Sequence, residues 1–196
     1  MKNQAKAWII LIVVLLVLLL LAGIVFAWYI SGYNKAVRLS EGAKTGWGDV
    51  DTMLQRRLDL IPNLLSTVKG YAEHEKELFE SIAKSREKYF QAGSTPADKM
   101  QASNQLSGFL SRLLVLQERY PDLKANENFR DLQVALEGTE NRIAVARSRY
   151  NAAVKELNTY TREFFGKFFC QRAGVEKAEY FEATEQAKTE VPKVEF

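Results

Sequence analysis

The first thirty residues contain the feature that most constrains the fold. Residues 7–30 form a run of 24 residues without a single charged side chain. At ~1.5 Å per residue, a helix of this length extends about 36 Å, enough to cross a hydrocarbon core of ~30 Å with some tilt. Trp8 lies at one end and Trp28 and Tyr29 at the other, where amphipathic rings favour the headgroup level. The run predicts a transmembrane helix.

A cleaved signal sequence accounts for this run less well than a membrane span does. A signal peptide could use Val25-Phe26-Ala27 as its cleavage site, but the run is longer than a usual signal-peptide core. A lipoprotein signal needs a cysteine where Ile24 stands. Basic residues are nearly balanced across the run (Lys2 and Lys6 before it; Lys35, Arg38 and Lys44 after it), so they leave open which side of the membrane the rest of the chain faces.

Charge and composition exclude several functional classes. Only Lys2 and Lys6 precede the run, so the chain beyond it carries 25 basic and 24 acidic side chains and lacks the basic surface typical of a nucleic-acid-binding protein. The chain has one cysteine, Cys170, and one histidine, His74, which excludes a disulfide framework and a cysteine zinc site.

Beyond the run, apolar residues recur with helical spacing, and prolines divide the pattern. Pro62, Pro96 and Pro121 predict boundaries because proline removes a hydrogen-bond donor and clashes within a helix. We therefore expect four helices over about 33–60, 63–92, 96–119 and 126–165, with Pro62 separating the first two. Short loops between them favour antiparallel neighbours.

Local capping signals support two of these helix starts. Thr95 can cap a helix that begins at Pro96, with Asp98 as the acidic partner of a capping box. Asn126 can cap the following long helix, and Glu127 in its first turn is favourable to the helix dipole.

The last long helix shows a heptad pattern over about five repeats. Apolar residues recur every seven positions, with smaller or aromatic residues between them: Phe129, Leu136, Ile143, Tyr150, Leu157 and Phe164, interleaved with Leu132, Thr139, Ala146, Ala153 and Tyr160. A strict seven-residue repeat predicts coiled-coil-like packing against neighbouring helices.

The sequence lacks the usual signatures of catalysis or cofactor binding. It contains no glycine-rich phosphate loop, no G-x-S-x-G and no H-E-x-x-H. We interpret His74, in Glu73-His74-Glu75, as part of a solvated charged face, and Cys170 as a packed, inert thiol. We expect no enzyme activity, no cofactor and no metal.

Polar residues close to the heptad pattern are candidates for structural or interaction roles. Such groups either fix helix register through half-buried hydrogen bonds, which we favour, or form a polar binding surface. The candidates are Arg57, Asn63, Tyr120, Glu140, Asn141, Arg147, Tyr150 and Asn151.

A cluster of phenylalanines follows the last long helix: Phe164, Phe165, Phe168 and Phe169, with Arg162, Lys167 and Arg172 close by. In an up-and-down four-helix bundle, this end of the last helix returns to the membrane. Aromatic and basic residues together are typical of an interfacial segment. Packing on the bundle core or against a second subunit remain the alternatives.

Several segments resemble one family. They are QRRLDLIPNL at 55–64, VKGYAEHE at 68–75, ERYPDLKAN at 118–126 and LEGTENRIA at 136–144, together with Tyr33-Asn34, Trp47, Phe129, Leu132-Gln133, Arg147 and Tyr150-Asn151. Over roughly residues 33–160 the chain resembles the LemA family. The resemblance implies a bacterial membrane protein with a short N-terminal tip, one span and an up-and-down helical bundle, without catalytic activity. Residues 164–170 depart from the family pattern in being more aromatic.

These observations predict an all-α protein, with an N-terminal transmembrane helix followed by an antiparallel up-and-down four-helix bundle of long coiled-coil-like helices. The expected regions are the tip and span (1–30), the helical bundle (31–165) and a C-terminal aromatic segment and tail (166–196). We expect a single-pass protein of the bacterial inner membrane that acts as a non-enzymatic scaffold; the alternative is an adaptor that couples a membrane partner to the bundle. Its expected partners are the lipid bilayer and other proteins, including further copies of itself, but not nucleic acid.

Overall fold

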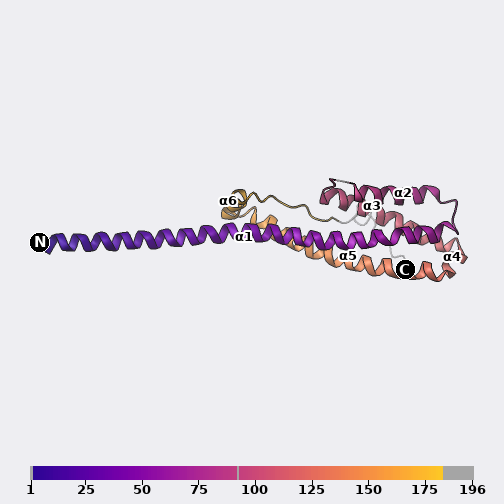
Figure 1. The fold of residues 1–196 in the computed structure, drawn as a ribbon, viewed down its shortest axis with the longest axis horizontal. Helices are drawn as coiled ribbons and strands as arrows, with labels where there is room; N and C mark the ends of the chain where they lie inside the picture. The colour runs from indigo at the N-terminus through magenta and orange to yellow at the C-terminus, as the bar shows by residue number, and fades with distance from the viewer. Residues whose placement is uncertain (1, 92, 183–196) are drawn as a thin grey trace, which may run out of the picture. The chain divides into compact units, whose positions relative to one another are not determined.

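The computed structural model describes residues 2–91 and 93–182, and within them every regular element is a helix. In chain order these are α1 (Lys2–Lys69), α2 (Lys76–Phe90), α3 (Pro96–Val115), the 3-10 turn η1 (Leu116–Glu118), α4 (Pro121–Ala125), α5 (Glu127–Tyr160) and α6 (Phe164–Ala173) (Figure 1). The expected all-α class is confirmed for these residues.

The chain divides into two compact units. Unit 1 contains the described residues up to Gly42 together with Lys155–Ala178. Unit 2 contains Ala43–Val154 together with the described residues from Glu179 onward. Each unit is built from segments that are distant in the sequence.

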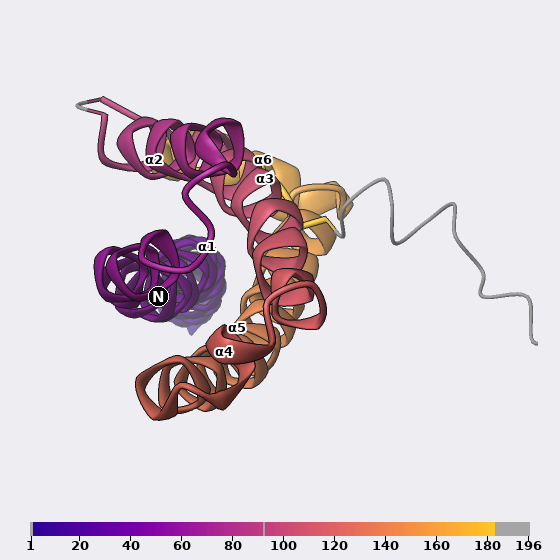
Figure 2. The same cartoon turned by 90° about the vertical axis from the view of Figure 1, so that its right-hand side faces the viewer.

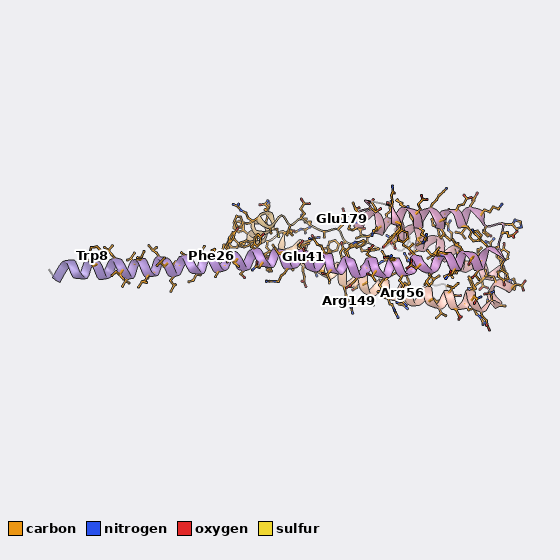
Figure 3. The ribbon with its side chains drawn as sticks, viewed as in Figure 1. Trp8, Phe26, Glu41, Arg56, Arg149 and Glu179 are labelled. Atoms are coloured by element: carbon orange, nitrogen blue, oxygen red, sulfur yellow. The ribbon has the colours of Figure 1, made fainter. Side chains whose placement is uncertain are left out.

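The apolar run lies in unit 1, within the first part of α1. Its side chains from Leu11 to Phe26 are exposed, and Trp8 and Phe26 are 67% and 65% exposed (Figure 3). Among the described helices, α1 is the one that is long and apolar enough to cross a membrane. An unbroken row of large exposed apolar side chains is costly in water and favourable in lipid.

The predicted boundary at Pro62 is wrong, because α1 continues through it to Lys69. Pro62 itself is exposed, whereas Leu58, Ile61 and Leu64 are at most 1% exposed. The proline costs a helix interior ~3 kcal/mol, but burying each aliphatic side chain contributes ~1.5–3 kcal/mol. Packing on both sides of the proline therefore offsets its local cost.

The chain instead turns at residues 70–75, so the expected helices 33–60 and 63–92 are corrected to α1 and α2. His74 lies in this connection and is exposed, in a loop rather than on the expected helix face. Helix α2 packs against α3 in unit 2 (Figures 1 and 2). The predicted start of α3 is confirmed: the Thr95 hydroxyl accepts from the Asp98 N–H at 3.2 Å, and Asp98 accepts from the Thr95 N–H at 2.9 Å.

Helix α5 confirms the predicted cap and most of the heptad pattern. The Asn126 side chain accepts from the Phe129 N–H at 3.0 Å, which caps the helix. Phe129, Leu136, Ile143, Tyr150 and Leu157 are all buried, as are Thr139, Ala146 and Tyr160 between them; Leu132 and Ala153 are half-buried.

The pattern fails at its last position, because α5 ends at Tyr160 and not at 165. Glu163 is extended (φ −62°, ψ 146°) and precedes the separate helix α6, so Phe164 leaves the heptad series and is 86% exposed. The chain folds back tightly at this point: a Cβ at Gly166 would overlap the carbonyl oxygen of Tyr160. Only glycine permits this approach.

Candidate functional site

A buried arginine at the centre of unit 2 connects three helices. Arg57 lies on the apolar face of α1, one turn after Leu54 and two turns after Val50, and it is 2% exposed. Its guanidinium donates to Glu140 Oε2 on α5 at 2.8 Å and, on α3, to the hydroxyls of Ser103 at 2.6 Å and Ser107 at 2.9 Å. It also donates to the Ser103 carbonyl at 3.2 Å. We call these four residues the Arg57 network.

The electrostatics of this network balance burial against charge pairing. Burial lowers the pKa of Arg57, and the Glu140 carboxylate opposes that effect. Glu140 is 49% exposed, so its carboxylate keeps contact with water while one oxygen pairs with the buried cation. Arg57 Nε is buried without a hydrogen-bond partner, so the network satisfies the guanidinium incompletely.

A second polar cluster in unit 2 connects α1, α2 and α3. The Tyr89 hydroxyl donates to Asp51 Oδ1 at 2.6 Å, and Lys99 Nζ forms an ion pair with the same oxygen at 2.8 Å. Burial and the bond to Asp51 raise the pKa of Tyr89 far above its ordinary value. The phenol therefore remains a donor throughout the physiological pH range.

Three predicted residues on α5 hold the extended segment at residues 179–182. The Asn151 side chain pairs with both backbone groups of Phe181, accepting from its N–H at 2.8 Å and donating to its carbonyl at 3.0 Å. The Tyr150 hydroxyl donates to the Glu179 carbonyl at 2.7 Å. The Arg147 guanidinium lies 4.1 Å from the centre of the Phe181 ring, and its Nε and Nη2 are buried without hydrogen-bond partners.

The same pairing recurs in unit 1, where Asn158 accepts from the Ala178 N–H at 3.1 Å and donates to its carbonyl at 2.9 Å. An asparagine side chain thus binds both backbone groups of one residue once in each unit.

Aromatic side chains of α6 pack against the end of the apolar run in unit 1. The ring centroid of Trp28 lies 5.1 Å from those of Phe165 and Phe169, and that of Tyr29 lies 5.8 Å from that of Phe169. A Cβ at Gly32 would overlap the Phe169 ring. The absence of a side chain at this position therefore lets α6 pack closely against α1. The Tyr160 hydroxyl donates to the Gly32 carbonyl at 3.0 Å, which ties the end of α5 to the same turn of α1.

The structure thus brings together five of the eight predicted polar residues. Arg57 and Glu140 pair directly, while Arg147, Tyr150 and Asn151 hold residues 179–181. Asn63, Tyr120 and Asn141 join neither group: Asn63 and Asn141 are exposed, and half-buried Tyr120 precedes α4. The roles of the partner residues depend on how distant helices align, so the sequence alone does not reveal them; these partners are Ser103, Ser107, Asp51, Tyr89, Lys99, Asn158 and Phe181.

Unit 2 also contains an open groove of about 1070 Å³ between α2, α3 and residues 179–182. Met100 and Phe109 form apolar parts of its lining, and Lys84, Arg112 and Tyr180 form polar parts. Within residues 2–91 and 93–182, no three His, Cys, Asp or Glu side chains are grouped to hold a metal ion. Cys170 is 2% exposed, and burial raises the pKa of its thiol.

The fold and these contacts define a helical protein with a membrane-compatible N-terminal helix. The model of the LemA family matches residues 46–196, so the chain belongs to the LemA family. It is also similar to three curated magnetosome proteins. They are MamQ 2 and MamQ 1 of Paramagnetospirillum magneticum, each 24% identical over 76% of this chain, and MamQ of Magnetospirillum gryphiswaldense, 22% identical over 76%. The chain spans 64% of the length of each of these relatives.

Proposed function

We propose that this protein is a non-enzymatic scaffold of the bacterial inner membrane, anchored by a single pass through residues 7–30. The exposed apolar part of α1 supports the anchor, and membership of the LemA family together with the similarity to magnetosome proteins supports a membrane setting. The scaffold acts through its helices in unit 2.

The observation that carries this proposal is the use of charged groups to join helices. Arg57 links α1 to α3 and α5, and Asp51 links α1 to α2 and α3. We infer that these four helices form an antiparallel up-and-down bundle whose polar groups set helix register. A rigid bundle on a membrane anchor presents fixed surfaces to protein partners, as a scaffold requires.

An exposed face of α5 is the surface that we expect to carry assembly. Val134 and Val145 are 68% and 52% exposed and lie eleven residues apart, which places them on one side of a helix together with the exposed Asn141. The predicted candidate Asn141 therefore belongs to this outer face of α5.

A second candidate function is an adaptor that couples a membrane partner to unit 2. It is favoured by the continuity of α1, which is one helix from Lys2 to Lys69 and includes both the apolar run and Arg57. An adaptor needs a second protein at the membrane, whereas a scaffold of this kind assembles with copies of itself.

Photocrosslinking in native membranes separates these functions. A photoreactive phenylalanine derivative is placed at Val134 or Val145. The matched control carries the same derivative at the exposed Asn128 of α5, which lies six residues before Val134 and so about 120° around the helix. Crosslinked dimers from the valine positions but not from Asn128 support the scaffold. Crosslinks to a different membrane protein support the adaptor instead, and the absence of any specific crosslink contradicts both.

A further inference from the structure

Helix α6 leaves a row of phenylalanine side chains without protein cover. Phe164, Phe165 and Phe168 are 86%, 56% and 42% exposed, whereas Gly166, Phe169 and Cys170 are buried. At 100° per residue the three exposed rings lie on one side of the helix, which we call the aromatic face. Lys167 is exposed and lies about 160° around the helix from Phe165 and about 100° from Phe168, at the polar edge of this surface. Gln171, seven residues after Phe164, lies on the same side as that ring.

The aromatic face lies at the end of the apolar run. Phe165 contacts Trp28 at a ring-centroid distance of 5.1 Å, and Phe168 contacts Tyr29 at 6.3 Å. Trp28 and Tyr29 are the last aromatic residues of the run, the position at which such rings mark the boundary between lipid and water. Phe165 and Phe168 contact these two residues, so their rings lie at the same depth relative to that boundary.

We propose that α6 is an interfacial helix that lies on the bilayer surface with its aromatic face below the headgroups. The proposal rests on the membrane span proposed above. The exposed rings are continuous with the exposed apolar surface of α1, so one occupant, the lipid bilayer, covers both. The geometry fits amphipathic helices that bury one apolar face at the boundary between headgroups and acyl chains.

The charged residues of α6 fit this orientation. The Arg172 guanidinium lies 5.6 Å from the Phe168 ring centre, so its aliphatic stem can follow the ring while its charge reaches the headgroups. Lys167, outside the aromatic face, reaches water or phosphate groups. The chain then contacts the bilayer twice, through the span and through α6, and both contacts belong to unit 1.

Site-directed spin labelling of the full chain in nanodiscs of phosphatidylcholine and phosphatidylglycerol tests the proposal. In a Cys170→Ser background, single cysteines replace Phe164, Phe168 or Lys167, and Leu19→Cys reports on the span. We expect labels at positions 19, 164 and 168 to collide more with oxygen than with a water-soluble nickel complex, by several-fold. The label at 167, outside the aromatic face of the same helix, should show the reverse.

The accessibilities of the labels distinguish the interfacial helix from its alternatives. Labels at 164 and 168 that are as accessible to nickel as the label at 167 overturn the interfacial helix, while a protected label at 19 in the same experiment leaves the span standing. A nickel-accessible label at 19 contradicts the span itself. Protection at 164 accompanied by spin–spin broadening that disappears on dilution with unlabelled protein shows that a second copy, and not lipid, covers the aromatic face.

Discussion

Removal of the Glu140 carboxylate is the sharpest test of the Arg57 network. Glu140→Ala leaves the guanidinium of Arg57, which is 2% exposed, without its counter-charge, although Ser103 and Ser107 still accept its N–H groups. Breaking a fully buried ion pair costs about 3–5 kcal/mol. Glu140 is 49% exposed, so water partly replaces it, and we expect a loss of about 2–3 kcal/mol in the free energy of unfolding.

Substitution of the arginine itself should cost less. Arg57→Met removes the buried charge and fills similar space, while Glu140 returns to water and the Ser107 hydroxyl keeps its bond to the Ser103 carbonyl at 3.1 Å. We expect a loss of about 0–1.5 kcal/mol, since a buried ion pair replaced by apolar atoms is often neutral. The double variant should resemble Arg57→Met alone, because the carboxylate then has no cation to stabilise.

Urea unfolding of the full chain in mild detergent, followed by circular dichroism, gives these free energies. Glu137→Ala is the matched control, because it removes an exposed carboxylate one turn earlier on α5, and it should stay within about 0.5 kcal/mol of the parent. If Arg57→Met costs more than Glu140→Ala, the attraction between the pair exceeds the cost of burying the cation, and our reasoning is refuted.

Three further predictions concern stability. Leu136→Ala and Ile143→Ala, which truncate side chains that are 5% and 0% exposed, should each lower the free energy of unfolding by about 2–5 kcal/mol, and losses below about 0.5 kcal/mol would show that these positions do not pack. Pro62→Ala should raise the thermal midpoint, because it restores a helical hydrogen bond at an exposed site; a lower midpoint would mean that the ring itself packs. Hydrogen bonds from Thr95 hold the pKa of Asp98 below its ordinary value, so this contribution to stability is present above the unfolded-state pKa and is lost as the pH falls through the folded-state pKa. In an NMR titration Thr95→Ala should raise the pKa of Asp98 toward its ordinary value, and an unchanged pKa would contradict the role of the cap.

Local chemistry made two helix starts predictable, those of α3 and α5. A capping box needs only a few neighbouring residues, so Thr95, Pro96 and Asp98 contain all the information that starts α3. The same holds for Asn126 at α5. These signals act over about one turn, and no distant part of the chain has to be known.

The two errors in helix bounds arise where tertiary packing outweighs local preference. Pro62 is a helix breaker by composition, but its neighbours Ile61 and Leu64 are fully buried, which stabilises the helix on both sides. At the other end Phe164 continues the seven-residue spacing, yet the chain leaves the helix at Thr161. Spacing alone cannot separate a ring that packs in a seam from one that begins a new helix.

The charged residues of the Arg57 network could be predicted from the sequence, but their serine partners could not. An arginine among apolar residues at helical spacing, such as Arg57 after Val50 and Leu54, is visible in a single sequence, and a carboxylate near a heptad pattern is visible in the same way. The serines that complete the network are ordinary helix residues. Their role depends on the alignment of α3 with α1, which no local pattern contains.

This dependence explains how one buried cation can specify an arrangement of helices. Ser103 and Ser107 are one turn apart on α3, and both accept from Arg57. The hydrogen bonds therefore form at only one position of α3 along α1. A slip of α3 by one turn moves its side chains by ~5.4 Å, beyond hydrogen-bond distance, and leaves N–H groups of a buried guanidinium unsatisfied. Apolar side chains tolerate such a slip far better, because their contacts are not directional. The Arg57 network therefore adds more to the specificity of the packing than to its net stability.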